Sequence, residues 1–229
     1  DLKSDVCGIY ITDNDSKGFK RILKTRHHIN SLAYSPDETF VIYEKLNSSN
    51  DGLHYIDLIQ NTDNFLLEDV FTYNLSRDGT KIVFDKRKDK NIYIMDLKSK
   101  VCEKIVTGRR PVWSPDGEYI AYNDCSNNKS QIGIIKIDGT KRRLVTPDGI
   151  NACDPNWSPD GSYLAFNIGR DICAYFMETG KIETLVSEGT ELWITDISSD
   201  SNMIAFCSLS DQGEDDEAYV FKLDRKSVV

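Results

Sequence analysis

The sequence predicts an all-β protein: a single β-propeller of four-stranded antiparallel blades, with five blades favoured and six as the alternative. A Ser-x-Asp corner recurs five times, with steps of 41, 38, 44 and 40 residues between the serines. A period of about 40 residues is typical of one propeller blade. A short run of β-branched and aromatic residues follows each corner, which indicates a strand buried on both faces. The corners are Ser35-Pro36-Asp37, Ser76-Arg77-Asp78, Ser114-Pro115-Asp116, Ser158-Pro159-Asp160 and Ser198-Ser199-Asp200.

We interpret the corner as a hairpin turn and not as a catalytic site. Proline fixes φ at the first turn position, aspartate accepts hydrogen bonds from the N–H groups ahead of it, and glycine supplies a positive φ. Because the corner recurs in every repeat, a shared turn explains it better than a single active site. Asp116 and Asp160 are therefore expected to be turn formers. The residue before each serine should wedge between neighbouring blades, and these residues are Tyr34, Leu75, Trp113, Trp157 and Ile197.

The other strands follow in the same order in each repeat. Third strands are expected at "GLHYIDL", "NIYIMDL", "QIGIIKID", "DICAYFME" and "EAYVFKLD", and fourth strands at "NFLLED", "EKIVTG", "RRLVTP" and "IETLVS". Four strands in a meander make one blade. We place all repeats in one domain, residues 1–229, with limits near 29–69, 70–107, 108–146, 152–187 and 192–223.

The two ends of the chain need a separate prediction. Residues 7–25 have the pattern of two strands, and the last repeat stops after its third strand. A ring closed by these N-terminal residues would remove exposed sheet edges. The strand count exceeds that of five blades by one. Either one blade has an additional outer strand or a half-blade marks a sixth position.

Composition excludes several classes of protein. The net charge of −9 argues against a nucleic-acid partner. No apolar run approaches the roughly 18 residues that cross a bilayer, so no membrane insertion is expected. The chain starts at Asp1 instead of Met and has no signal peptide. We expect a trimmed, periplasmic or extracellular monomer. The six cysteines lie far apart without a C-x-x-C motif, which leaves buried thiols or one or two disulfides open.

Two repeats resemble a known family. The copies "WSPDGEYIAY…IGIIKIDGTKRRLVT" and "WSPDGSYLAF…ICAYFMETGKIETLV" resemble the WD-like repeat of the TolB β-propeller family, and the likeness extends over residues 29–223. The resemblance implies the fold. It leaves the function open, since the same repeat occurs in prolyl-oligopeptidase-like enzymes, oligogalacturonate lyases and surface proteins. Unlike TolB, the sequence shows no separate N-terminal α/β domain, and its blade count is five where six is usual.

Known catalytic motifs are absent from the sequence. There is no G-x-S-x-G, H-E-x-x-H, Walker loop or dinucleotide fingerprint. The three histidines, His27, His28 and His54, read as ordinary loop and strand residues. We therefore expect no catalytic residues, no metal and no cofactor. The predicted function is a non-catalytic scaffold that binds a protein or peptide through one loop-rich rim. The alternative is the propeller of a carbohydrate- or peptide-processing enzyme.

Two groups of candidate binding residues follow from the blade register. Polar residues of the first strands should face the central channel and ring a ligand or an ion, with ordered water as the alternative. These are Asn74, Arg110, Asp154, Asn156 and Asp196. Loops between second and third strands share one rim with the loops between fourth and first strands, and an asymmetric field there would orient a charged partner. The rim candidates are Lys86, Arg87, Lys88, Arg109, Asp211, Glu214, Asp215 and Asp216.

Overall fold

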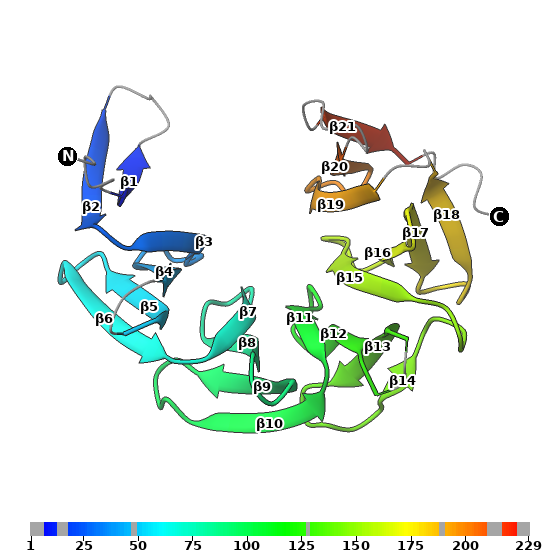
Figure 1. Cartoon of the computed structure of the whole chain (residues 1–229), viewed down its shortest axis with the longest axis horizontal. Helices are drawn as coiled ribbons and strands as arrows, with labels where there is room; N and C mark the ends of the chain where they lie inside the picture. Colours follow the sequence, from blue (N-terminus) through cyan, green and yellow to red (C-terminus); the bar gives the residue numbers. More distant parts are fainter. Residues whose placement is uncertain are drawn as a thin grey trace. The chain divides into compact units, whose positions relative to one another are not determined.

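The computed structural model describes residues 7–12, 18–46, 50–126, 129–187, 191–209 and 217–223. In these ranges the chain forms strands and turns. Among these residues there is no helix that is long and apolar enough to cross a membrane. The chain divides into two compact units, Asp1–Phe71 and Thr72–Val229, which are described one at a time. Figure 1 labels the strands in chain order.

The first unit contains a hairpin and one four-stranded antiparallel sheet. The hairpin pairs β1 with β2, and the sheet has the strand order β3-β4-β5-β6. Ile9, Tyr43 and Ile56 form the buried core of this unit. The strands are β1 (Cys7–Thr12), β2 (Phe19–Thr25), β3 (His28–Tyr34), β4 (Phe40–Leu46), β5 (Gly52–Asp57) and β6 (Thr62–Leu67).

The second unit contains three four-stranded sheets and a three-stranded sheet, all antiparallel meanders. Within this unit, the first strands β7, β11, β15 and β19 lie on the inner side of the fan of sheets and the fourth strands lie on its outer side (Figure 1). The strands are β7 (Val70–Leu75), β8 (Lys81–Lys86), β9 (Asn91–Asp96), β10 (Cys102–Thr107), β11 (Arg109–Trp113), β12 (Tyr119–Asp124), β13 (Gln131–Lys136), β14 (Arg143–Leu144), β15 (Ala152–Trp157), β16 (Tyr163–Ile168), β17 (Asp171–Phe176), β18 (Ile182–Val186), β19 (Glu191–Ile197), β20 (Met203–Leu209) and β21 (Glu217–Lys222).

The predicted fold class is confirmed. The five corners each join the first and second strands of one blade sheet, and the strand order inside every sheet is the predicted meander. The last sheet has three strands among the described residues, as the sequence predicts. The single domain and the closure of the ring by residues 7–25 stay predictions.

Apolar side chains hold neighbouring sheets of the second unit together. Trp113, which is 8% exposed, packs against Val83 and Ile92 of the preceding sheet. Trp157 and Ile197 occupy the same register at the next two junctions. The wedge prediction is confirmed for these three residues. It is wrong for Tyr34, which is 47% exposed, so the side chain at this register is not buried in every repeat.

The corners have the predicted turn geometry. Oδ1 of Asp116 accepts hydrogen bonds from the Ser114 hydroxyl at 2.5 Å and from the Glu118 N–H at 2.9 Å. Asp160 accepts equivalent bonds from Ser158 and Ser162 at 2.8 and 3.0 Å. Both carboxylates are therefore turn formers, as predicted.

The residue after each corner aspartate has a left-handed backbone. Its φ is +59° at Glu38 and +58° at Ser201, against +71° to +73° at the three glycines of the other corners. Only glycine adopts this region without steric cost. Glu38→Gly is therefore expected to raise the free energy of unfolding by about 0.5–1 kcal/mol. Relief of the backbone strain stabilises the folded chain, and the greater conformational entropy of glycine in the unfolded chain offsets part of this gain. Urea unfolding measures the change.

The matched control for this prediction is Gly117→Ala. An added Cβ at Gly117 meets nothing within 4 Å, and its φ is +73°, so only backbone strain changes. This variant should be destabilised by a similar amount. Lower stability of Glu38→Gly would contradict the argument from strain.

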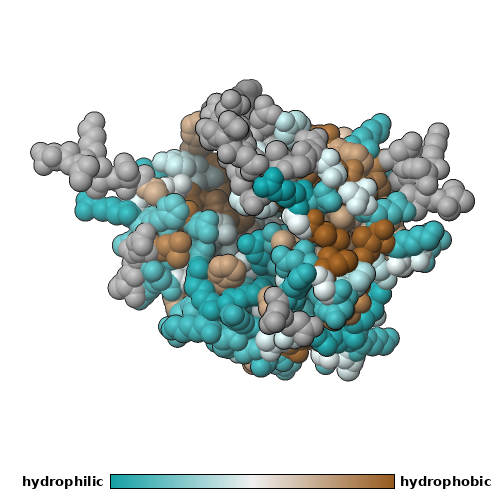
Figure 2. Space-filling view, turned by 45° about the vertical axis from the view of Figure 1, so that its right-hand side comes forward, coloured by the Kyte–Doolittle hydropathy of each residue, from teal (hydrophilic) through white to brown (hydrophobic). Residues whose placement is uncertain are grey.

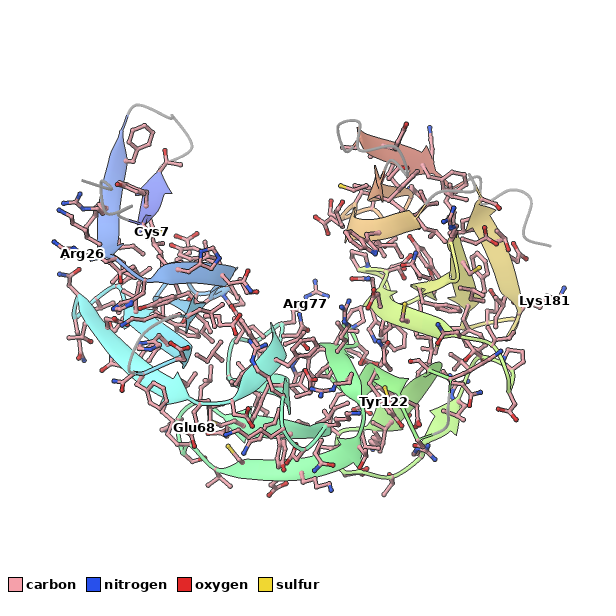
Figure 3. The ribbon with its side chains drawn as sticks, in the orientation of Figure 1. Cys7, Arg26, Glu68, Arg77, Tyr122 and Lys181 are labelled. Carbon is pink, nitrogen blue, oxygen red and sulfur yellow. The ribbon has the colours of Figure 1, made fainter. Side chains whose placement is uncertain are left out.

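One cross-strand pair recurs in each sheet and fills its centre. A large buried aromatic residue on the second strand lies opposite a variable partner on the third strand. Phe84 and Tyr93 stack with ring centroids 5.6 Å apart, and Tyr122 lies opposite Gly133. Figure 3 labels Tyr122 between its neighbouring strands. The other pairs are Tyr43–His54, Phe166–Cys173 and Phe206–Tyr219.

The core lies between the sheets, and the surface is correspondingly polar. Among the coloured residues of Figure 2, hydrophilic ones predominate on the lower part of the visible face, and hydrophobic ones form smaller groups between them. The exposed apolar side chains of the second unit include Trp193 on the inner strand β19, which is 50% exposed. An exposed tryptophan on an inner strand indicates that the surface lined by these strands is a candidate binding surface.

Candidate functional site

The inner strands of the second unit carry β-bulges. The register of β11 shifts between Arg109 and Val112 against β12, and that of β15 shifts between Cys153 and Asn156 against β16. The extra residue has a positive φ in both strands, +51° at Arg110 and +60° at Asp154. A left-handed backbone costs roughly 1–2 kcal/mol at a residue with a Cβ. Bulges of this kind re-aim side chains and are frequent beside functional sites.

The two bulges bring Arg110 and Asp154 into an ion pair. Nη1 of Arg110 donates to Oδ1 of Asp154 across the neighbouring inner strands β11 and β15. The Asp154 backbone is fixed on both sides: its N–H donates to Oδ1 of Asn123 at 3.0 Å, and its carbonyl accepts from Nδ2 of Asn156 at 3.0 Å. The Arg110 side chain is about half exposed, so the pair is open to a ligand.

This ion pair lies in the wall of a cavity of about 440 Å³. The volume falls in the range of small-ligand sites, roughly 300–1,000 Å³. All four inner strands of the second unit contribute to the wall. Besides the ion pair, the lining consists of Thr72, Tyr73, Pro111, Val112, Pro155, Asn156, Trp193 and Ile194. Flat aromatic and proline faces therefore surround one fixed pair of opposite charges.

A buried carboxylate connects the cavity wall to the predicted basic rim. Asp85, at the end of β8, accepts hydrogen bonds from the N–H and hydroxyl of Thr72 at 3.1 and 2.6 Å. Its other oxygen binds Nη1 of Arg109 at 3.0 Å. The Arg109 guanidinium also donates to the carbonyls of Lys86 and Arg87 at 2.7 and 2.9 Å. The loop after β8 is thus fastened beside the start of β11, one residue before Arg110.

The predicted channel residues separate into two groups. Arg110, Asp154 and Asn156 line the cavity together. Asn74 instead joins two sheets, because its Oδ1 and its carbonyl accept hydrogen bonds from the N–H and indole Nε1 of Trp113 at 3.0 and 3.1 Å. Asp196 accepts from the N–H of Ile197 at 2.8 Å and is not part of the cavity lining.

The predicted rim residues differ in their surroundings. Arg87 and Lys88 are exposed, whereas Lys86 is half-buried with its ammonium 4.9 Å from the centre of the Tyr93 ring. The Arg109 guanidinium is already bound by the buried Asp85 carboxylate. The four acidic candidates, Asp211, Glu214, Asp215 and Asp216, lie outside the described residues.

Most of the apolar lining of the cavity is not among the residues predicted from the sequence. Tyr73, Pro111 and Pro155 each stand three residues before a corner serine, so a comparison of repeats at that register would have found them. Trp193 stands five residues before Ser198. Its signal was a tryptophan at a register where the other repeats have no common residue type.

Cysteine and histidine chemistry is not concentrated at this cavity. Burial, with the Asp154 charge as a second cause, raises the pKa of Cys153 to about 11, so this thiol is protonated at neutral pH. His54 is buried in the first unit between Tyr43 and Phe65. Throughout the part of the chain that the structure describes, no three His, Cys, Asp or Glu side chains are grouped to hold a metal ion.

Similar proteins share this architecture. The structure of TolB from Acinetobacter baumannii has a TM-score of 0.72 at 19% identity, covering 94% of this chain and 57% of TolB. An oligogalacturonate lyase in complex with manganese has a TM-score of 0.71 at 21% identity, covering 93% of this chain and 67% of the lyase. A chain of the nidogen–laminin complex has a TM-score of 0.59 at 16% identity, covering 90% of this chain and 84% of that one.

These likenesses show the fold alone, because identity is low in each case. The chain spans a little over half the length of the TolB structure. No curated protein matches the sequence. A family model of the TolB β-propeller domain matches residues 3–214, which is most of the chain. The chain therefore belongs to the TolB β-propeller family.

Proposed function

We propose that this propeller is a non-catalytic binding module that takes up a segment of a protein partner at the cavity between its inner strands. The Arg110–Asp154 pair carries the proposal. Two charged residues are held at strained bulges and aimed at one another in an open cavity wall. Strain of this kind persists only where the surrounding structure imposes it, and it gathers at functional sites.

The chemistry of the lining suits a polypeptide. The faces of Tyr73, Trp193, Pro111 and Pro155 offer contact area for apolar and proline side chains. A carboxylate of the partner would compete with Asp154 for the Arg110 guanidinium, and a cation or N–H donor would compete with Arg110 for Asp154. The fixed pair therefore selects the orientation of a charged segment as well as its presence.

The neighbouring rim supports recognition at this end of the strands. Arg87 and Lys88 are exposed on the loop that Arg109 fastens beside the cavity wall. Positive charge there would steer an acidic partner. The nidogen–laminin structure is a complex between proteins, which supports a role of this fold in protein association. We also propose that the protein is periplasmic or extracellular and that it is a monomer, as the sequence predicts.

A site-specific photocrosslink tests this proposal. With p-benzoylphenylalanine in place of Trp193, illumination in a native extract should give a discrete polypeptide adduct, because residue 193 lines the cavity. The same amino acid in place of Lys181, an exposed residue on another part of the second unit, should give none (Figure 3). Arg87→Ala/Lys88→Ala should weaken the dependence of adduct yield on salt.

The charge-swapped variant Arg110→Asp/Asp154→Arg separates recognition from stability. It keeps an ion pair between β11 and β15, so a purely structural pair predicts an unchanged adduct. Recognition by the pair predicts a loss of roughly tenfold, equal to about 1.4 kcal/mol. An unchanged yield would contradict the proposal. An oligosaccharide bound at residue 193 without a polypeptide would favour the enzyme-related alternative.

A further inference from the structure

A groove opens at the junction of the β7–β10 and β11–β14 sheets, near the corner turns. It consists of two contiguous cavities of about 340 and 490 Å³ that share Lys81 and Ile137. It runs from Arg77 and Pro115 at its inner end to Val101 at its outer end. Figure 3 labels Arg77 beside the inner ends of β7 and β11. No residue lines both this groove and the cavity of the Arg110–Asp154 pair.

The repeats show why the groove is open at this junction. Five residues after the corner serine stands Lys81 here, Tyr119 at the next junction and Tyr163 at the one after. Tyr119 packs into the apolar cluster between its two sheets, and Tyr163 is fully buried there. A lysine cannot fill the same space with apolar surface, because its ammonium stays in water.

A second position shows the same difference. The residue after the corner serine is Arg77 at this junction, whereas it is Pro115 at the next, where the proline lies 4.0 Å from the position of a Cβ on Gly161. The next junction therefore has a proline and a tyrosine at the positions where this one has an arginine and a lysine.

The floor of the groove is apolar and its walls are acidic. Ile94, Ile137 and Trp113 line the floor, and Val101 is 56% exposed at the outer end. The two cations of the lining, Arg77 and Lys81, face five carboxylates, which are Asp78, Asp96, Glu103, Asp116 and Asp138.

Hydrogen bonds favour the charged form of three wall carboxylates, Asp78, Asp96 and Asp138. Hydrogen bonds from the Ser76 hydroxyl and the Thr80 N–H lower the pKa of Asp78. Bonds from Ser99 and from Thr140 lower the pKa of Asp96 and of Asp138 in the same way. Lys136 lies 3.9 Å from Asp138 and offsets part of one charge. The groove therefore has a negative balance at neutral pH.

We propose that this groove docks an extended peptide segment in which apolar and basic side chains alternate. Alternate side chains of an extended strand point to opposite faces, so the apolar ones reach the floor while the basic ones point away from it and bring their charged ends to the acidic rims of the groove through their long stems. Complementary charge and an apolar floor together define this partner. The inference does not depend on the proposed function of the inner-strand cavity.

Binding of a defined peptide tests the groove directly. The probe is fluorescein-labelled Leu-Lys-Leu-Lys-Leu-Lys amide, and the control is the same peptide with glutamate for lysine. Fluorescence anisotropy with the full chain should show saturable binding of the lysine peptide that weakens as salt is added. Equal binding of the glutamate peptide, or no binding of either, would overturn the proposal.

The filling variant Arg77→Pro/Lys81→Tyr copies the residues that the next junction of this same chain has at these positions, Pro115 and Tyr119. It removes two positive charges, so charge alone predicts tighter binding of a basic peptide. Filling of the groove predicts at least a tenfold loss of affinity with an unchanged or higher melting temperature. The control Lys104→Ala/Lys181→Ala removes two exposed cations outside the groove and should bind as the unmodified chain does.

A second variant keeps the test decisive if the filled chain folds poorly. Asp96→Asn/Glu103→Gln leaves the groove open and removes two wall charges. It should lower the affinity for the lysine peptide several-fold. Undiminished binding in either variant would refute the groove as the docking site. The unmodified chain could instead bind no peptide and self-associate, with the self-association lost in the filling variant. That result would identify a second copy of the chain as the occupant of the groove and would also refute the proposal.

Discussion

Gly133→Ala is expected to lower the free energy of unfolding by about 3 kcal/mol, the upper part of the usual cost of overpacking. A Cβ at this position would lie 2.6 Å from Cζ and 2.8 Å from Cε1 of Tyr122. The direction is opposite to the usual effect of alanine in a strand, where glycine is the weaker residue. Urea unfolding followed by tryptophan fluorescence measures it.

Tyr122 has no room to move away from a new methyl group. The residue is fully buried, and a Cβ at Gly108 would lie 2.5 Å from its Cδ2. Its hydroxyl accepts a hydrogen bond from Nε of Arg142 at 2.9 Å, and Nη2 of Arg142 also binds the buried Asp124. The ring is therefore enclosed between two glycines and anchored at its end.

A double-mutant cycle separates this clash from other effects of the substitution. Tyr122→Ala alone removes a buried aromatic ring and should cost about 3–5 kcal/mol. In the Gly133→Ala background the same change also relieves the clash, so it should cost markedly less. Additive effects of the two substitutions would show that Gly133 is not required by the tyrosine ring.

Asp85→Ala is expected to cost about 3–5 kcal/mol, because it removes one partner of a buried ion pair. Asp85 is fully buried and accepts hydrogen bonds from Thr72 and Arg109, which lie on two neighbouring inner strands. Its loss removes this acceptor from the N–H and hydroxyl of Thr72 and removes the Asp85 charge from beside the largely buried guanidinium of Arg109. Chemical denaturation gives the change in stability.

Two comparisons test the Asp85 argument. In Asp85→Ala/Arg109→Leu the uncompensated cation is gone as well, so the double variant should be less destabilised than the sum of its single variants. The exposed pair between Glu118 and Lys136, 3.9 Å apart, is the matched surface case, and Glu118→Ala should cost less than about 1 kcal/mol. Similar costs for Asp85→Ala and Glu118→Ala would show that burial does not set the energy of these pairs.

The fold could be predicted from the sequence because its signals are local. A corner such as Ser114–Tyr119 closes its hydrogen bonds within six residues, between the serine hydroxyl, the aspartate carboxylate and the N–H groups that follow. The alternation of the strands is equally local. Repetition of these short patterns about every 40 residues then predicts a propeller.

The site could be predicted only in part, because it depends on contacts between repeats. The sequence predicts both Arg110 and Asp154 as channel residues, yet their pairing joins positions 44 residues apart through two bulges. A bulge displaces the register by one residue, and a displacement of one residue turns a side chain to the other face. Register alone does not decide which side chains line the cavity: Asn156 and Asp196 lie opposite the equivalent residues Ala165 and Ala205, yet of the two only Asn156 lines it.

By itself the sequence determined the all-β class, the meander order, the corner turns and the absence of familiar catalytic motifs. Only the tertiary structure decided which charged residues form partners, that Arg109 binds the buried Asp85, and that Lys81 lines a groove at one junction while Tyr119 packs into an apolar cluster at the next. The physical reason is distance along the chain. Turn and strand preferences act between near neighbours, whereas ion pairs and junction packing depend on how separate repeats meet.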